Sequence, residues 1–181
     1  MDTWDNLKTK HNYAADEVVS ALQKSIRRGN EEDAVFFAYE MMNTSIELAE
    51  KFWQRIRVIS VEDIGLANPQ LIAAMVALYE NFKMLGEKED RFLQGLMATI
   101  LLCRSNKSRY IDELYNNIKE KVETEDYRRE IPAYAIDKHT QKGEKLGKDL
   151  LHFWEEASQI KNDISENEKI NLKEILLRIK K

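Results

Sequence analysis

The sequence predicts an all-α protein, a bundle of about seven or eight helices. The helical spacing of apolar residues is the only period that recurs along the chain. Glycine and proline, which interrupt helices, number only 6 and 2 among 181 residues. Charged residues make up 33% of the chain and hydrophobic residues 43%, a balance typical of a folded helical protein.

The first three helices follow from their apolar faces and their ends. Residues 13–28 form the first, where Val18, Leu22 and Ile26 share one face and Gly29 ends the helix. Asn30 is expected to cap a second helix, which a short link pairs antiparallel with the first. Thr44 or Ser45 is expected to cap the third. Its apolar side is predicted to consist of Ile46, Ala49, Phe52, Trp53, Ile56 and Ile59.

The stretch SVEDIGLANP, residues 60–69, is predicted to separate the third helix from the fourth. Ser60 and Asp63 resemble a partial capping box, and Gly65 supplies a flexible position. Asn68 suits an N-cap, and Pro69 suits the first helical position. The segment QLIAAMVALY that follows is apolar almost all round, which predicts a core helix around which the others pack.

The fourth helix is expected to end near Leu85 and the fifth to begin near Lys88, which makes residues 69–103 a central hairpin. The fifth helix is predicted to carry the apolar residues Phe92, Leu93, Leu96, Met97, Ile100 and Leu101. A sixth helix is predicted over residues 108–122, with an apolar stripe of Ile111, Leu114, Ile118 and Val122.

We expect residues 1–122 to form the helical core and residues 123–181 a C-terminal extension, packed on the core or on a neighbouring subunit. The extension is predicted to contain a loop-rich segment and two short helices, the first over residues 148–160. Ser165 and Glu168 form a capping box for the second.

Composition bears on the cellular location of the protein and on its attraction to nucleic acid. The longest apolar runs, residues 71–79 and 96–103, are too short to span a bilayer, and the polar N-terminus is unlike a signal peptide. The single Cys103 cannot form an internal disulfide and fits a reducing compartment, so a cytoplasmic location is expected. The net charge of −4 gives no general attraction to nucleic acid.

The residues alone predict no catalytic, cofactor or metal site. GEKLGKD, residues 143–149, superficially resembles a phosphate-binding loop, but it has three residues between its glycines where four are needed, and Asp149 replaces the Ser or Thr that holds magnesium. A metal-dependent enzyme is the weakest hypothesis. Its candidate residues are Asp137, His139 and His152, with His11, Glu62 and Asp63 as further possible ligands. None of these residues has the spacing of a ligand pair on a helix.

Basic residues at helix ends have two interpretations. Structural use is the default, because arginine and lysine stabilise the C-termini of helices. They can also follow a nucleic-acid backbone. The candidate nucleic-acid contacts are Arg104, Lys107 and Arg109, together with Arg55 and Arg57.

Several aromatic residues exceed what one core can bury. Phe36, Tyr39 and Trp53 cannot all face the same core, so we expect some apolar surface to remain as a partner or self-association face.

Three segments, in order, resemble a known family: LQKSIRRGNEEDAVFFAYEMM, RIRVISVEDIGLANPQLIAAMVALYENFKMLG and LMATILLCRSNKSRYIDEL. They are similar to the C-terminal region of the clamp-loader-like AAA+ ATPases called replication-associated recombination protein, or MgsA, in bacteria and Werner-helicase-interacting protein in eukaryotes. Residues 16–114 carry the resemblance, and it weakens beyond residue 131, where AYAIDKHTQKGEKLG replaces the family's aromatic signature. Val61 stands where the family usually has serine. The matching motif positions are Lys24, Ser25, Ile26, Arg27, Arg55, Arg57, residues 62–69, Arg104, Ser105 and Asn106.

The resemblance implies a helical domain like the clamp-loader collar, acting as a non-catalytic oligomerisation module, expected to be a tetramer, of an ATPase at replication forks. Implied partners are the AAA+ ATPase modules, single-strand-binding protein and DNA. No Walker A or Walker B motif is present, so ATP hydrolysis would belong to a missing N-terminal region or a partner chain. A nucleic-acid-binding accessory module is the alternative.

The residues 60–69 are therefore expected to specify the fold and not a reaction. We expect Glu62 and Asp63, beside Arg55 and Arg57, to hold the third helix to the fourth. Glu62 is expected to be paired, and Gly65 to have a positive φ. The structural motif is predicted to consist of Arg55, Arg57, Glu62, Asp63, Gly65, Asn68 and Pro69.

Overall fold

The computed structural model describes residues 7–161 and residue 178, and these residues confirm an all-helical fold. They contain eight α-helices and, apart from one isolated antiparallel bridge between Lys8 and Ala14, no β-structure. The chain divides into two compact units, residues 1–125 and 126–181. The helix predicted after Ser165 lies outside the described residues.

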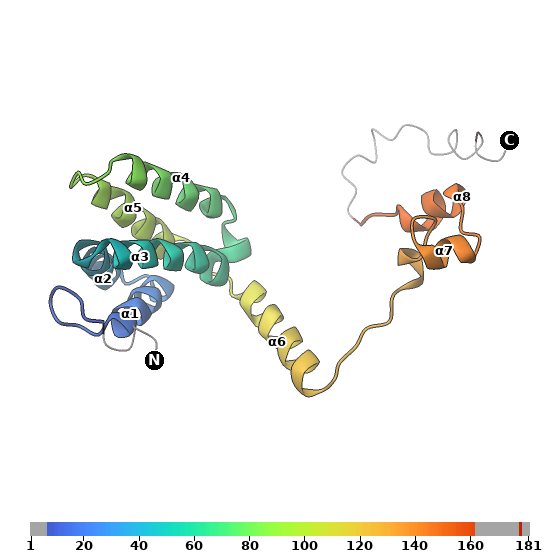
Figure 1. The fold of residues 1–181 in the computed structure, drawn as a ribbon, viewed down its shortest axis with the longest axis horizontal. Coiled ribbons are helices and arrows are strands. Elements are labelled where there is room, and N and C mark those ends of the chain that lie inside the picture. Colours follow the sequence, from blue (N-terminus) through green and yellow to red (C-terminus); the bar gives the residue numbers. More distant parts are fainter. Residues whose placement is uncertain (1–6, 162–177, 179–181) are drawn as a thin grey trace. The chain divides into compact units, whose positions relative to one another are not determined.

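Six α-helices form the first unit (Figure 1). They are α1 (Ala15–Arg28), α2 (Glu31–Thr44), α3 (Ile46–Ile59), α4 (Gln70–Met84), α5 (Arg91–Arg104) and α6 (Tyr110–Thr124). A π-helical turn, η1 (Ser60–Ile64), extends α3, and the short 3₁₀ turn η2 (Gly65–Ala67) follows it.

The ends of the first three helices agree with the sequence. Gly29 ends α1 in the left-handed conformation, with φ 71°, and its N–H donates to the carbonyl of Ile26. Asn30 precedes α2, although its side chain donates to the Asp33 carboxylate and not to the helix backbone. Ser45 caps α3, because its Oγ accepts from the Leu48 N–H at 3.1 Å.

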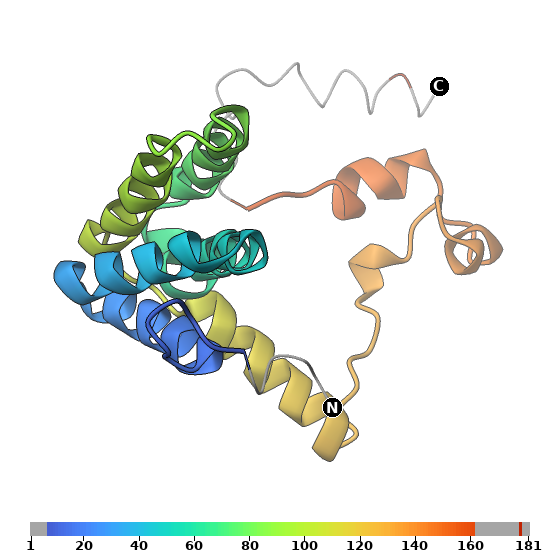
Figure 2. The same ribbon diagram turned by 60° about the vertical axis from the view of Figure 1, so that its left-hand side comes forward.

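The core lies mainly against α3, which supplies the fully buried Phe52 and the 1%-exposed Trp53. α5 packs between α2 and α4, and α2 packs on α1 and α3 (Figure 2). The prediction for Ile46 was wrong, because this residue is 75% exposed in the first turn of α3.

The prediction that α4 is the helix around which the others pack was also wrong. Only Leu71, Met75 and Phe82 of α4 are buried, whereas Ile72 and Val76 are 39% and 48% exposed. α4 packs chiefly on α5 and less on α3, so its apolar far side is left at the edge of the bundle.

The buried residues of α5 are others than the apolar residues named for it from the sequence. Leu93 and Met97 are 61% and 51% exposed, and the interior side holds the smaller Gly95, Ala98 and Thr99 together with Leu102 and Cys103. Close helix packing explains the difference, because a Cβ added at Gly95 would lie 2.3 Å from the Sδ of Met42.

The sixth helix buries none of its residues. Its predicted apolar stripe forms, but each of the four residues is exposed by 38–45%. α6 contacts the rest of the unit at η1 and η2, and it runs away from the bundle (Figures 1 and 2).

The described part of the second unit contains η3 (Ala133–Ala135), α7 (Gln141–Lys145), α8 (Leu150–His152) and the π-helical turn η4 (Phe153–Ala157). The helix expected over residues 148–160 is thus shorter and ends in a π-turn. Within the described ranges, no helix is long and apolar enough to cross a membrane.

Candidate functional site

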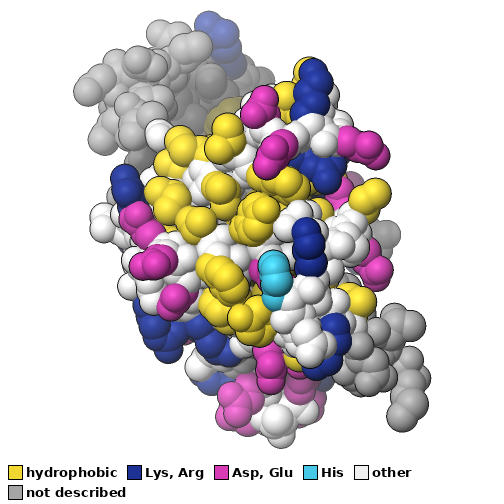
Figure 3. Space-filling view, turned by 90° about the vertical axis from the view of Figure 1, so that its left-hand side faces the viewer, with side chains coloured by type: hydrophobic (Ala, Val, Ile, Leu, Met, Phe, Trp, Pro, Cys, Tyr) yellow, Lys and Arg dark blue, Asp and Glu magenta, His cyan; other side chains and the backbone are white. Residues whose placement is uncertain are grey.

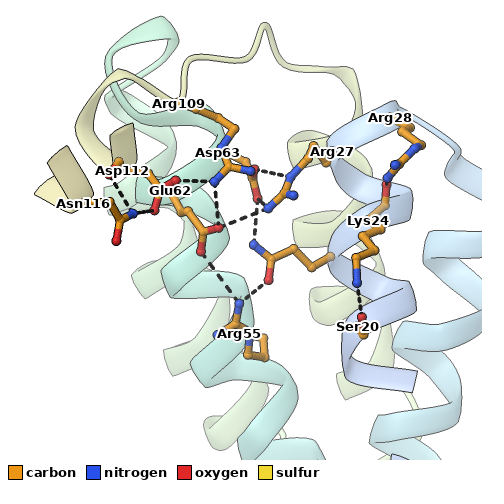
Figure 4. A network of polar contacts seen from close by, with 11 residues as sticks. Ser20, Lys24, Arg27, Arg28, Arg55, Glu62, Asp63, Arg109, Asp112 and Asn116 are labelled. Carbon is orange, nitrogen blue, oxygen red and sulfur yellow. Dashed lines mark hydrogen bonds and ion pairs between the residues drawn. The ribbon is translucent and has the colours of Figure 1, made fainter. Parts of the chain in front are cut away.

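The residues of SVEDIG form the centre of a polar network between helices (Figure 4). α3 does not end at Ser60 but continues as the π-turn η1, in which the Ser60 Oγ donates to the Arg57 carbonyl at 2.7 Å. The predicted capping box therefore does not form. Gly65 then reverses the chain with φ 48°, as expected, and a Cβ there would lie 3.2 Å from the Ser108 carbonyl oxygen.

Asp63 joins three parts of the first unit. Its side chain is fully buried, and Oδ1 accepts from Arg27 Nε at 2.6 Å while Oδ2 accepts from Gln23 Nε2 at 3.0 Å. Its backbone carbonyl accepts from the Ser108 N–H at 2.9 Å. Asp63 thereby connects η1 with α1 and with the segment between α5 and α6.

Glu62 is paired, as predicted, and three arginines surround it. Its carboxylate oxygens lie 3.1 Å from Arg27 Nη2, 3.7 Å from Arg109 Nη2 and 3.9 Å from Arg55 Nη2. Its side chain is 24% exposed, so these pairs are only partly screened by water. Arg109 also pairs with Asp112, and its hydrogen bond lowers the pKa of that carboxyl group.

The partners of Glu62 and Asp63 correct one expectation. The two acids connect η1 with α1, α3 and the start of α6, and not α3 with α4. A separate contact joins α3 and α4: the Arg57 guanidinium lies 4.2 Å from the centre of the Tyr79 ring, and the Tyr79 hydroxyl donates to Glu50 at 2.7 Å. This hydrogen bond raises the pKa of Tyr79.

The start of α4 differs from the prediction by one residue. Pro69 occupies the cap position and Gln70 is the first helical residue. Asn68 contributes its backbone carbonyl, which accepts from the Leu71 N–H at 3.2 Å, and no side-chain cap forms there.

Arg104, Lys107 and Arg109, three of the five candidate nucleic-acid contacts, each have partners within the chain. Arg104 binds both carboxylate oxygens of Glu31, at 2.7 and 3.0 Å. Lys107 Nζ donates to the carbonyls of Leu102, Cys103 and Ser105 at 2.8, 2.9 and 2.6 Å, and burial lowers its pKa.

Of the three residues in the metal-enzyme hypothesis, the structure brings Asp137 and His139 into contact. Asp137 Oδ2 lies 3.0 Å from His139 Nδ1, and this hydrogen bond lowers the pKa of Asp137. His152 Nδ1 is buried without a hydrogen-bond partner. Where the structure is described, no three His, Cys, Asp or Glu residues come together in a way that could hold a metal ion.

Gln23 and Arg27 belong to the network but not to the predicted structural motif. Both lie on α1, four positions apart and therefore on one face of the helix. Gln23 is 9% exposed, and such a buried polar side chain on an otherwise apolar face needs a partner. A polar residue at position 23, on the apolar face of this helix, is the signal by which the sequence could have indicated that Gln23 has a buried partner.

The fold and this network define a helical module whose charged residues hold its helices together. The chain belongs to the family of the MgsA AAA+ ATPase C-terminal region, whose pattern matches residues 29–171. The match continues well beyond residue 131, where the resemblance was expected to weaken.

Two curated relatives carry the name replication-associated recombination protein A. The protein from Bacillus subtilis is 30% identical over 139 residues, which is 74% of this chain and 31% of that protein. The protein from Haemophilus influenzae is 27% identical over 123 residues, or 68% of this chain and 26% of that protein. The chain thus matches less than a third of the length of either relative.

Proposed function

We propose that this chain is a non-catalytic oligomerisation module, forming a homotetramer, of an AAA+ ATPase that acts in replication-associated recombination. The observation that carries the proposal is the uncovered apolar side of α6. A helix with a continuous apolar stripe normally packs that stripe against another surface. On α6, Ile111, Leu114, Ile118 and Val122 are all exposed.

The surface around α6 is continuous with a groove at the end of α3. The groove has a volume of about 440 Å³. It is lined by Arg57, Val58, Val61, Glu62, Ile111, Asp112 and Tyr115. The carboxylates and Arg57 already have partners, so the apolar side chains of the groove are the part that a second copy would cover.

A second apolar surface lies on α2 and α5, where Phe36, Tyr39, Leu93 and Met97 are exposed by 41–61%. Tyr39 contacts Phe92 at a ring distance of 5.8 Å, which joins the two helices. Figure 3 shows hydrophobic side chains gathered on one face of the molecule. This surface is the alternative location for self-association.

Light scattering of the purified chain tests the proposal. We expect a mass of four chains, and we expect Leu114→Ser with Ile118→Ser to lower it, because both substitutions place hydroxyl groups in the stripe. The matched control is Leu93→Ser with Met97→Ser, which should leave the mass unchanged. The reverse pattern would move the interface to α2 and α5, and a strict monomer would contradict the proposed function.

The proposed cellular setting follows from the family. The partners would be AAA+ ATPase modules, single-strand-binding protein or DNA, in the cytoplasm. Direct nucleic-acid binding through Arg104, Lys107 and Arg109 is the second candidate, and it would require these residues to exchange their present partners for phosphates. Salt-dependent binding to forked DNA that is lost on charge reversal of the three residues would support it.

A further inference from the structure

A small polar hollow lies beside the Glu62–Asp63 network, between α1, α3 and η1 (Figure 4). Its volume is about 220 Å³, compared with about 30 Å³ for one water molecule in the liquid. It is lined by Ser20, Gln23, Lys24, Arg27, Arg55 and Glu62. It therefore has room for a small polar ion together with several waters.

Cations outnumber anions around this hollow. Lys24, Arg27 and Arg55 face one carboxylate, Glu62, while the buried Asp63 is occupied by Arg27 and Gln23. Lys24 Nζ donates to the Ser20 hydroxyl and has no carboxylate partner among the described residues. Arg28, one turn from Lys24, donates to the Lys24 carbonyl. This part of an acidic chain, with net charge −4, is thus locally basic.

Arg55 provides the second observation. Its Nη2 donates to Gln23 Oε1 and lies 3.9 Å from Glu62, but its Nε is buried and has no hydrogen-bond acceptor. A buried N–H of a charged group without an acceptor is unfavourable, and an acceptor in the hollow would relieve it.

We propose that this hollow binds an oxyanion of the phosphate type. Such an ion offers several acceptor oxygens to the Arg55 fork, and its charge balances Lys24. Glu62 holds Arg27 and Arg55 in place while reducing the net positive charge, so binding is weak and sensitive to ionic strength. The phosphate group belongs either to a free ion or to a nucleic-acid backbone. This hollow shares Glu62 with the groove beside α6, and its other lining residues differ from those of the groove.

Two probes distinguish the two sources. Backbone amide chemical shifts are followed while inorganic phosphate is added, with sodium chloride at equal ionic strength as the reference. Fluorescence anisotropy measures the binding of a labelled thymidine oligonucleotide across salt concentrations. The test variant is Lys24→Gln, and the matched control is Lys88→Gln, which removes the same charge from an exposed lysine between α4 and α5.

We expect phosphate to change the backbone amide chemical shifts of Ser20, Gln23, Lys24 and Arg55 by more than chloride does. We expect Lys24→Gln to weaken phosphate binding by about tenfold, because the substitution removes a charged contact. If a nucleic-acid phosphate is the ligand, the oligonucleotide competes with inorganic phosphate, and Lys24→Gln lowers the slope of log affinity against log salt by about 0.7. If a free ion is the ligand, only inorganic phosphate binds. Arg55→Lys, which keeps the charge but loses the Nε–H, should also weaken binding in a variant shown to be folded.

Two results would overturn the proposal. One is the absence of local amide shifts with phosphate and of Lys24-dependent oligonucleotide binding. The other is an equal loss of affinity in Lys24→Gln and Lys88→Gln, which would show a general effect of charge instead of a site.

Discussion

Replacing Asp63 with asparagine removes the charge at the centre of the polar network while nearly preserving its shape. In the native chain the carboxylate is fully buried and accepts from both Arg27 and Gln23. An asparagine amide has one acceptor oxygen, so its NH₂ group would face a donor from one of these partners. Arg27 would also lose its closest counter-charge, at 2.6 Å.

The expected cost follows from the burial of the pair. Removing one partner of a buried ion pair costs about 3–5 kcal/mol. Arg27 is 28% exposed and keeps Glu62 at 3.1 Å, which places the change at the lower end, about 3 kcal/mol. With a denaturant dependence of about 1–3 kcal/mol per molar urea, the unfolding midpoint should fall by about 1–3 M.

Urea unfolding followed by far-UV circular dichroism measures this change. The matched control is Glu31→Gln, which breaks the exposed Arg104–Glu31 pair and should leave the midpoint nearly unchanged. If Asp63→Asn lowers the midpoint no more than Glu31→Gln does, the network makes no net contribution to stability and the structural role given to SVEDIG is wrong.

Three further predictions concern other parts of the chain. Lys107→Gln should destabilise the first unit by about 1–2 kcal/mol, seen as faster amide exchange at the end of α5, because three carbonyls lose a charged donor; unchanged exchange would contradict this. Burial raises the pKa of Cys103 from 9.0 to about 11, so its reactive thiolate forms only at higher pH. At pH about 8, iodoacetamide should therefore alkylate Cys103 at least tenfold more slowly in the folded chain than in the urea-unfolded chain. Equal alkylation rates would show that the thiol is accessible. Gly143→Ala should disrupt the turn around α7, because a Cβ would lie 1.7 Å from the Asp137 carbonyl oxygen; amide exchange should rise in the second unit alone, and retained protection near Thr140 would refute the reasoning.

The helix ends and the class of fold could be predicted because they depend on neighbouring residues. Gly29, Asn30 and Ser45 each act within one turn of their own helix, so local sequence is sufficient to place them. The positive φ of Gly65 is equally local, since glycine readily adopts it.

The buried faces of α4 and α5 could not be predicted because they depend on which helices touch. Both helices are apolar on more than one side, and a hydrophobic pattern alone does not say which side meets the core. Gly95 decides the orientation of α5 by allowing close approach to Met42 and Phe52. That choice exposes Leu93 and Met97, two of the apolar residues that the sequence places on this helix.

The partners of the charged residues were harder still to predict. Arg27 and Glu62 are 35 residues apart, and Arg104 and Glu31 are 73 apart, so no local pattern pairs them. The basic residues near residue 105 were candidates for DNA because lysine and arginine dominate protein contacts to phosphates. In the folded chain, Arg104 and Lys107 instead complete the contacts of α2 and α5.

Sedimentation equilibrium of the chain over a range of concentrations tests the central claim, that this family member assembles copies of itself through α6. We predict a self-association equilibrium that reaches four chains at tens of micromolar and shifts toward single chains when Leu114 and Ile118 are replaced by serine. A single-chain mass at every concentration, with the helical circular dichroism spectrum intact, would contradict the account.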